Sequence, residues 1–531
     1  MGTNGERGRS RFWKRRRSGD EPADQQQLEI PLERPASADE EFLEQMRAAI
    51  EAAAPHHEPE SPRDLAALAD LVTYQQTGEA RVPHVSVPTG AWNTLASESV
   101  ARGLRRLETP GRDEALFKMA LIEPTHLSAV LMTAAAALVL KTGDVAPWRH
   151  RAHSEHHDPR PIPGEEKAGV MIGMAFTGPC EPVITPLADP QWFQLDGVDL
   201  IVHSHLYDAL IVRVPEPNAR ATCYLVPVHS DKGRPNGIEV LRLFGKPGTA
   251  PQAFAEAKLD GSRAVRIGPA GVGDDLLEPA IARLRTDAAI IGAAQMRVAV
   301  DALAEGLERR KGADVFHRLL VSDIEAVVAR EMAFAASRET AGPVLGELAL
   351  VVAQHWVRSR SEAIIPDAAA IVHLEETARP GLTFTSPLLP LWGATPVVLR
   401  AEFARLVKQG RLEVFLEACA KKPASTPLAA TFRWLLELAL DAEAPIRDRL
   451  EATSLLWAAS ILVDLGRIDA AASLLGADAV PIQRSELVQA RRSAAEKATN
   501  PGPEDSGRLV VDLRSVDSPI GVPTSLDLGY S

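Results

Sequence analysis

Hydrophobic residues recur every three or four positions along most of the chain, which is the spacing of helices with one buried face. The first such stretch carries Phe42, Met46 and Ile50 behind a capping residue at Ser37 or Asp39. The helices predicted after it span residues 91–107, 113–122, 124–141, 274–307, 316–337, 342–360, 362–374 and 397–420, with two more between 427 and 475.

The apolar period changes toward two between about residue 167 and residue 275, as expected for strands. The segments ALIVRVPEP, ATCYLVPVHS and GIEVLRLFG look like strands that end at Pro, Gly or Asn turns. The preceding segment, residues 150–167, contains three prolines and is predicted to be a linker. No internal repeat of fixed period is visible.

This order of elements predicts an α+β fold with an antiparallel β-domain between two helical domains. We place the N-terminal helical domain at 37–166, the middle β-domain at 167–275 and the C-terminal helical bundle at 276–480. The polar composition outside them predicts a disordered basic tail over 1–36 and a flexible tail over 481–531.

Composition adds limits on the class of protein. The 531 residues are 45% hydrophobic and 24% charged, which excludes a fibrous or wholly disordered chain. The net charge of -13 disfavours attraction of the bulk protein to nucleic acid, and residues 401–531 carry fifteen basic against eighteen acidic side chains. Seven basic side chains lie in residues 1–20; we interpret them as a solvated tail, with contact to nucleic acid or lipid head groups as the alternative.

Cysteine usage and hydropathy bear on the compartment. The three cysteines are too scattered for a disulfide framework, which favours a reducing cytoplasm. No apolar run reaches the roughly 18 residues of a membrane span, and the longest, residues 128–141, is predicted to be a buried helix. The basic start lacks the apolar segment of a secretory signal. We therefore expect a cytoplasmic protein without membrane insertion.

Several motifs in the middle region occur in the same order as in a known protein family. GMAFTGP at 173–179 resembles a strand ending in M-T-E-P, and LDGVDLIVHSHLYDALIV at 195–212 resembles L-N-G-x-K-x-W-I-T-N-x-x-x-A-D. The stretch from Lys246 to Gly273 resembles a K-x-G segment, a strand and a closing L-G-x-x-G-x-G, with Gly248, Phe254, Gly268 and Gly271 as the other counterparts. In this order, over roughly residues 38–475, the chain is similar to the acyl-CoA dehydrogenase superfamily, and most similar to its DNA-alkylation-response (AidB-like) branch through residues 73–95 and 228–248.

The resemblance implies a flavoprotein that oxidises acyl-CoA, with a carboxylate as the base and FAD as the hydride acceptor. The family's usual Glu lies in an (I/L)-(W/Y)-E-G-T motif, but this chain has PLWGATP and Gly393 stands at the Glu position. Glycine cannot accept a proton. Some members carry the base on another helix, so Glu278, Asp287 and Glu402 stay open as candidates.

The residues that the family uses to hold flavin are only partly kept. Thr177 is present in the first motif, and Ser204 in the second could donate one hydrogen bond. Asp199 stands at the Lys position and Ile201 at the Trp position, so the aromatic platform beside the flavin is lost. The family's pyrophosphate-binding Arg has its nearest counterpart in Arg310 or its neighbour Arg309, without the Phe-Gly that should follow, and residues 372–382 carry acids in place of a glycine loop.

Two other clusters have a plainer interpretation. The histidine-rich segment HRAHSEHH at 150–157 could offer metal ligands, but its prolines favour a mobile loop and we predict no metal site. His203, Ser204, His205 and Asp208 invite a Ser-His-Asp interpretation, which neighbours on one strand cannot satisfy because they alternate faces.

Three functions follow from these observations. The first is a catalytically degenerate protein of this fold, with FAD doubtful, that serves as a scaffold, partner subunit or ligand-binding module, as a homo-oligomer (dimer or tetramer) or with an active relative. The second is an FAD-dependent acyl-CoA dehydrogenase-like oxidoreductase with a relocated base, and the third is an AidB-like protein associated with nucleic acid. Thr177, Ser204 and Arg310 are the cofactor-binding candidates, and no catalytic residue is assigned.

Overall fold

The computed structural model describes residues 90–475 of the chain. Gaps in the described range fall at 123, 125, 142–144, 161, 178–181, 204–206, 217–218, 230–233, 245–253, 308–312, 340–345, 374–394 and 421–425. The two predicted tails and the helix predicted near residue 42 therefore lie outside the described residues.

Helices precede the sheet, as predicted. They are α3 (Gly90–Ala101), α4 (Arg112–Ile122), α5 (Leu127–Val139) and α6 (Ala146–Ala152). The first ends six residues earlier than its predicted end at 107, because the chain turns at Gly103, whose φ is 78°. A Cβ at Gly103 would lie 2.7 Å from the Oγ1 atom of Thr109, so the turn needs glycine both for its backbone angle and for space.

Nine strands form one mixed sheet in the described part of the chain. In sequence they are β1 (Ile172–Thr177), β2 (Val183–Pro186), β3 (Trp192–Asp196), β4 (Val198–His203), β5 (Ala209–Glu216), β6 (Ala219–Pro227), β7 (Ile238–Phe244), β8 (Phe254–Leu259) and β9 (Ser262–Ile267). Their order across the sheet is β2-β3-β9-β6-β5-β1-β4-β8-β7. The pair β1–β5 is parallel and the others are antiparallel, so the prediction of an antiparallel middle sheet holds except at its centre.

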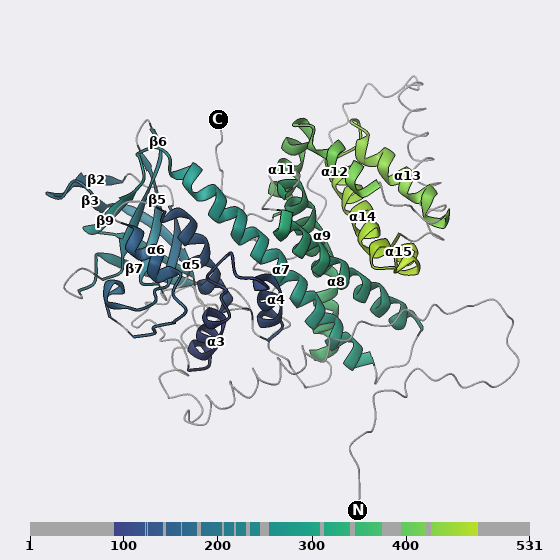
Figure 1. Cartoon of the computed structure of the whole chain (residues 1–531), viewed down its shortest axis with the longest axis horizontal. Coiled ribbons are helices and arrows are strands. Elements are labelled where there is room, and N and C mark those ends of the chain that lie inside the picture. Colours follow the sequence, from purple (N-terminus) through teal and green to yellow (C-terminus); the bar gives the residue numbers. More distant parts are fainter. Residues whose placement is uncertain are drawn as a thin grey trace, which may run out of the picture. The chain divides into compact units, whose positions relative to one another are not determined.

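Three long helices follow the sheet: α7 (Gly273–Leu307), α8 (Ala313–Glu339) and α9 (Gly346–His373). Figure 1 shows α7 running from the sheet toward α8 and α9, and it contacts β6 as well as both of these helices. The predicted break of α9 at residue 361 was wrong. Ser361 is buried and its hydroxyl donates to the carbonyl of Arg358 one turn back, so this polar residue stays within the helix.

A further helical layer comes from the end of the described chain. It contains α11 (Pro396–Lys408), α12 (Arg411–Ala420), α13 (Thr426–Leu440), α14 (Ile446–Asp464) and α15 (Ile468–Leu475). The single helix predicted over 397–420 was wrong, because Gly410 adopts a φ of 72° and ends α11. The two helices predicted between 427 and 475 are three, since Gly466 makes a similar turn before α15.

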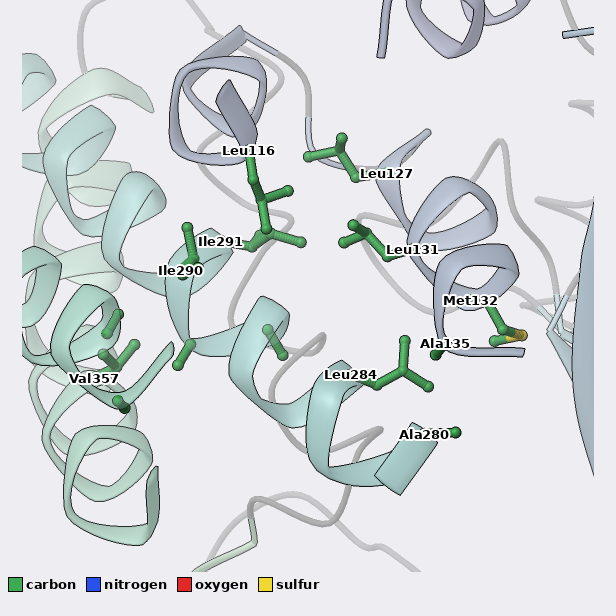
Figure 2. Packing of buried hydrophobic residues seen from close by; sticks show 14 of the residues in the cluster. Leu116, Leu127, Leu131, Met132, Ala135, Ala280, Leu284, Ile290, Ile291 and Val357 are labelled. Carbon is green, nitrogen blue, oxygen red and sulfur yellow. The ribbon is translucent and has the colours of Figure 1, made fainter. Parts of the chain in front are cut away.

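The hydrophobic core joins helices that precede the sheet in the sequence to helices that follow it. Figure 2 shows Leu116 of α4, Leu127 and Leu131 of α5, and Ile291 of α7 pointing toward one another. All four side chains are buried, and α5 also packs against β1. Segments 160 to 175 residues apart in sequence therefore share one interior, and burial of their apolar surface holds α4 and α5 against α7.

The segment predicted to be a linker is a packed connection. It begins with the end of α6 and continues into a short 3-10 turn, η2 (Gly164–Glu166). Lys167 at its end and Asp158 in its middle are buried. Its histidines do not gather into a metal site: within the described ranges, no group of three His, Cys, Asp or Glu side chains could hold an ion. None of the helices described is long and apolar enough to cross a membrane.

Helix α14 is tied to α8 and α9 by ion pairs around Glu451. Its carboxylate accepts hydrogen bonds from His355 Nε2 at 2.8 Å and from Arg360 Nη2 at 2.6 Å, and Arg360 also pairs with Glu325 at 3.1 Å. Burial alone would raise the pKa of Glu451, but the hydrogen bond from His355 and the charge and hydrogen bond of Arg360 outweigh it and lower the pKa to about 2.

We expect Glu451 to make the free energy of unfolding decrease at acidic pH. Because its folded pKa lies below its ordinary value of 4.5, the contribution is present above pH 4.5 and is lost as the pH falls toward 2. Glu451→Gln should take up fewer protons on unfolding, by up to about one, in urea titrations between about pH 5 and 3. Glu443→Gln, at an exposed carboxylate in the turn before α14, is the control. If the free energy of unfolding changes with pH by the same slope in both variants, the prediction is contradicted.

Candidate functional site

The two motifs that resemble flavin-binding strands lie side by side in the sheet. Strand β1 carries the first motif and β4 the second, and they pair antiparallel with Phe176 opposite Ile201 and Thr177 opposite Leu200. Thr177 is half-buried at the end of β1. The structure thus brings together two segments whose closeness the sequence could only suggest by analogy. Ser204 follows β4 directly and lies outside the described residues, as do Arg310 and Gly393.

The outward face of β4 is defined by alternation along the strand. Ile201 is 45% exposed, whereas its neighbours Leu200 and Val202 are 1% and 5% exposed. Asp199 shares the face of Ile201 because strand side chains alternate, and it is half-exposed. Across the pair with β8, Asp199 lies opposite Lys258 and Ile201 opposite Glu256. The face therefore offers one aliphatic side chain, two carboxylates and the ammonium group of Lys258.

This face is a poor fit for a flavin. An isoalloxazine ring is held by stacking and by donors to its polar edge, and its pyrophosphate needs cations or free N–H groups. Ile201 supplies no aromatic surface, and the carboxylates of Asp199 and Glu256 oppose an anionic cofactor. Arg213 on β5, next to β1, is engaged by Asp274 at 2.6 Å. This face thus gives the cofactor no aromatic platform.

Asp287, a candidate base, is sealed in a network of arginines. Its two oxygens accept from Nη1 and Nη2 of Arg112 at 2.8 and 2.9 Å, and Arg283 on the preceding helical turn also donates to it. Burial alone would raise the pKa of Asp287, but the charges and hydrogen bonds of Arg112 and Arg283 leave the pKa below its ordinary value. A general base needs access to substrate, which the fully buried Asp287 does not have.

The other two candidate bases differ from each other. Glu402 on α11 accepts from Nη1 and Nη2 of Arg285 on α7, both at 2.7 Å, while Gln354 on α9 holds the same guanidinium. Its carboxylate therefore links two helices. Glu278 lies exposed near the start of α7, and no ion pair to it exists among the described residues. Of the three, only Glu278 has a carboxylate open to a ligand.

The glycines of the closing motif have a structural cause. Gly268 and Gly271 adopt φ values of 69° and 75° in the turn between β9 and α7, and the amide of Gly271 donates to Thr222 Oγ1 at 2.9 Å. A Cβ at Gly273 would lie 2.7 Å from the carbonyl oxygen of Ala221. The motif thus joins the sheet to α7, and its presence does not depend on flavin chemistry.

Both carboxylate oxygens of Asp208 are engaged by residues outside the Ser-His-Asp cluster that the sequence suggested. One of its oxygens pairs with Lys167 Nζ at 2.8 Å and the other accepts from the amide of Met171 at 2.8 Å. Ser204 and His205 lie outside the described residues, so the absence of a triad stays a prediction.

Sequence reasoning missed the arginines that organise the interior. They stand on α4, on α7 and in the loop after α3, and each meets partners that are distant in sequence. The members of this set are Arg105, Arg112, Arg283, Arg285 and Arg297. In a single sequence a buried arginine has the same letter as an exposed one, and the partners lie up to 175 residues away, so no local signal reveals them.

Solved structures resemble this chain at low identity. ACDH-11 of Caenorhabditis elegans, in complex with C11-CoA, matches with a TM-score of 0.60 at 16% identity, covering 86% of this chain and 93% of its own. An acyl-CoA dehydrogenase from Bacillus anthracis complexed with FAD matches at 0.55 and 12%, covering 84% and 83%. Butyryl-CoA dehydrogenase from Megasphaera elsdenii matches at 0.51 and 12%, covering 70% and 99%.

These similarities define the class of fold. No protein-family model matches the chain, and no curated protein matches it by sequence. In the described chain, helices precede and follow a curled β-sheet in the sequence. This arrangement is the acyl-CoA dehydrogenase fold, which confirms the predicted fold class.

Proposed function

We propose that this chain uses the acyl-CoA dehydrogenase fold as a scaffold or ligand-binding module and does not dehydrogenate acyl-CoA. In this proposal it works as a homo-oligomer or beside an active relative, in the cytoplasm, and binds no FAD. The domains are those drawn from the sequence, at 37–166, 167–275 and 276–480. The finer assignment to the AidB-like branch is part of the same proposal, without its nucleic-acid role.

The observation that carries the proposal is the pairing of β1 with β4. The first motif ends at Thr177, opposite the buried Leu200 of β4, and the outward face of β4 presents Asp199 and Ile201 where the resembled family has Lys and Trp. The sealed carboxylate of Asp287 and the paired carboxylate of Glu402 support it, because two of the three alternative bases are already used to join helices. A site without these groups can still bind a ligand or contact a partner subunit.

The purified full-length chain is expected to be colourless and inactive. Absorbance at about 450 nm should be absent after purification and after incubation with excess FAD followed by desalting. Dye-coupled oxidation of acyl-CoA substrates from short to long chains should stay at the level of a blank. Stoichiometric bound FAD would contradict the proposal that the chain binds no FAD. Flavin-dependent turnover would contradict the proposal that it does not dehydrogenate acyl-CoA.

A paired variant shows whether the β4 face is the cause. Asp199→Lys combined with Ile201→Trp restores the cation and the aromatic surface, and should raise FAD affinity by about tenfold. Val183→Trp, on the exposed edge strand β2, adds an aromatic elsewhere on the sheet and should change nothing. If the two variants bind FAD equally, the β4 face does not set flavin affinity.

The second candidate function is an FAD-dependent oxidoreductase with a relocated base. It is favoured by one observation, the exposed carboxylate of Glu278 at the start of α7. The same turnover assay decides between the two. If activity is found, Glu278→Gln should abolish it while leaving any bound FAD in place.

A further inference from the structure

Arg105 is a buried cation with no carboxylate hydrogen-bonded to it. It lies in the loop after α3 and is 0% exposed. Its Nη1 donates to the carbonyl of His156 at 3.4 Å and its Nη2 to the Sδ atom of Met171 at 2.9 Å. A thioether is a weak acceptor, and Nε has no partner in the part of the chain that the structure describes. A guanidinium has five N–H donors, so three of them, including Nε–H, are unused within the described residues.

The neighbouring carboxylate is already engaged by a second cation. Asp208 pairs with Lys167, which is also buried, at 2.8 Å, and its other oxygen accepts from the amide of Met171. A carboxylate carries at most one negative charge, and burial, by raising the pKa of Asp208, favours its neutral form. Burial lowers the pKa of Arg105 to about 10, partly opposed by Asp208, so Arg105 is protonated at neutral pH.

The other titratable groups nearby do not remove the positive charge. Burial, together with Arg105 and Lys167, lowers the pKa of His157 to about 4, so its imidazole is neutral at neutral pH. Asp158 is paired with the exposed Arg160 at 2.6 Å, and these two charges cancel. Two buried cations thus face a single buried anion, which leaves one positive charge without compensation among the described residues.

We propose that a small monovalent anion of halide size binds next to Nε of Arg105. An uncompensated buried charge is strongly unfavourable, and an anion that accepts from Nε supplies both the missing charge and the missing acceptor. A single surplus charge matches a monovalent ion. Because Arg105 is 0% exposed, the site suits a small enclosed ion rather than an extended ligand that reaches the surface. This site is separate from the β4 face and independent of the proposed function.

Bromide is the direct probe of this site. Crystals of the unaltered full-length chain grown in sodium bromide should show an anomalous scattering peak within hydrogen-bond distance of Arg105 Nε. A water molecule, a carboxylate from elsewhere in the chain, or no density at that position would overturn the proposal.

Thermal unfolding tests the same site in solution. At equal ionic strength, replacing gluconate by chloride should raise the Tm of the unaltered chain by about 2 °C, because the anion binds only the folded state. Arg105→Met removes the surplus charge and should abolish that dependence. Arg220→Met, which alters an exposed arginine on β6 that pairs with the exposed Asp275, should keep it. Equal chloride dependence in the unaltered and Arg105→Met chains would contradict the proposal, and the bromide experiment decides if that variant does not fold.

Discussion

Replacing Asp287 by asparagine is expected to lower the free energy of unfolding by about 3–5 kcal/mol, because it leaves the cations of Arg112 and Arg283 without their shared anion. Both arginines are buried or nearly so, and water cannot take the place of the carboxylate. An asparagine keeps the shape but offers one acceptor and an N–H group that faces two guanidinium groups. Urea denaturation followed by circular dichroism measures the change.

Asp275→Asn is the matched control on the same helix. Asp275 pairs with Arg220 at 2.6 Å, but both side chains are about 60% exposed, so its loss should cost less than about 1 kcal/mol. The comparison also bears on chemistry. If Asp287 were a catalytic base, Asp287→Asn would remain folded and lose activity; a stable Asp287→Asn chain would contradict the structural role assigned to the carboxylate.

Gly273→Ala is expected to cost about 3 kcal/mol of stability, through crowding rather than through lost contacts. The added Cβ would lie 2.7 Å from the carbonyl oxygen of Ala221 and 3.1 Å from the amide nitrogen of Cys223. Both are backbone atoms of β6, so neither can move aside as a flexible side chain would. The first turn of α7 would have to shift away from the sheet.

Gly410→Ala separates this effect from backbone strain. Gly410 has a φ of 72° and no atom within 4 Å of a Cβ, so the substitution should cost only the left-handed conformation, about 1 kcal/mol. Both variants can be followed by the urea midpoint. If the two substitutions cost the same, close approach to β6 is not the reason for glycine at 273.

The type of each element could be predicted because its cause is local. The change of apolar period near residue 167 marks the sheet, and the return of helical spacing near 274 marks α7, since the period decides which side chains reach the core. The errors also have local causes that were overlooked. Gly410, followed by a charged residue in the middle of an apolar pattern, is a helix-ending signal that the wider periodicity concealed.

The arrangement of the candidate site could be predicted only in part. The resemblance placed Thr177 and Ile201 in related motifs, and the β1–β4 register puts them on adjacent strands. The state of the candidate bases could not be predicted, because it depends on contacts over long separations. Asp287 meets Arg112 across 175 residues and Glu402 meets Arg285 across 117. A single sequence contains the residues of these pairs but not the fact that they meet.

The docking of α4 on α7 has a consequence for the timing of folding during synthesis. Arg112 and its partner Asp287 are 175 residues apart, so at about 5–20 residues per second a ribosome needs roughly 10–35 s to supply the second after the first. In that interval the apolar surfaces of α4 and α5, including Leu116 and Leu131, have no α7 to cover them. We expect the nascent chain to bind chaperones most strongly while the sheet is being made, and to be released once α7 has emerged.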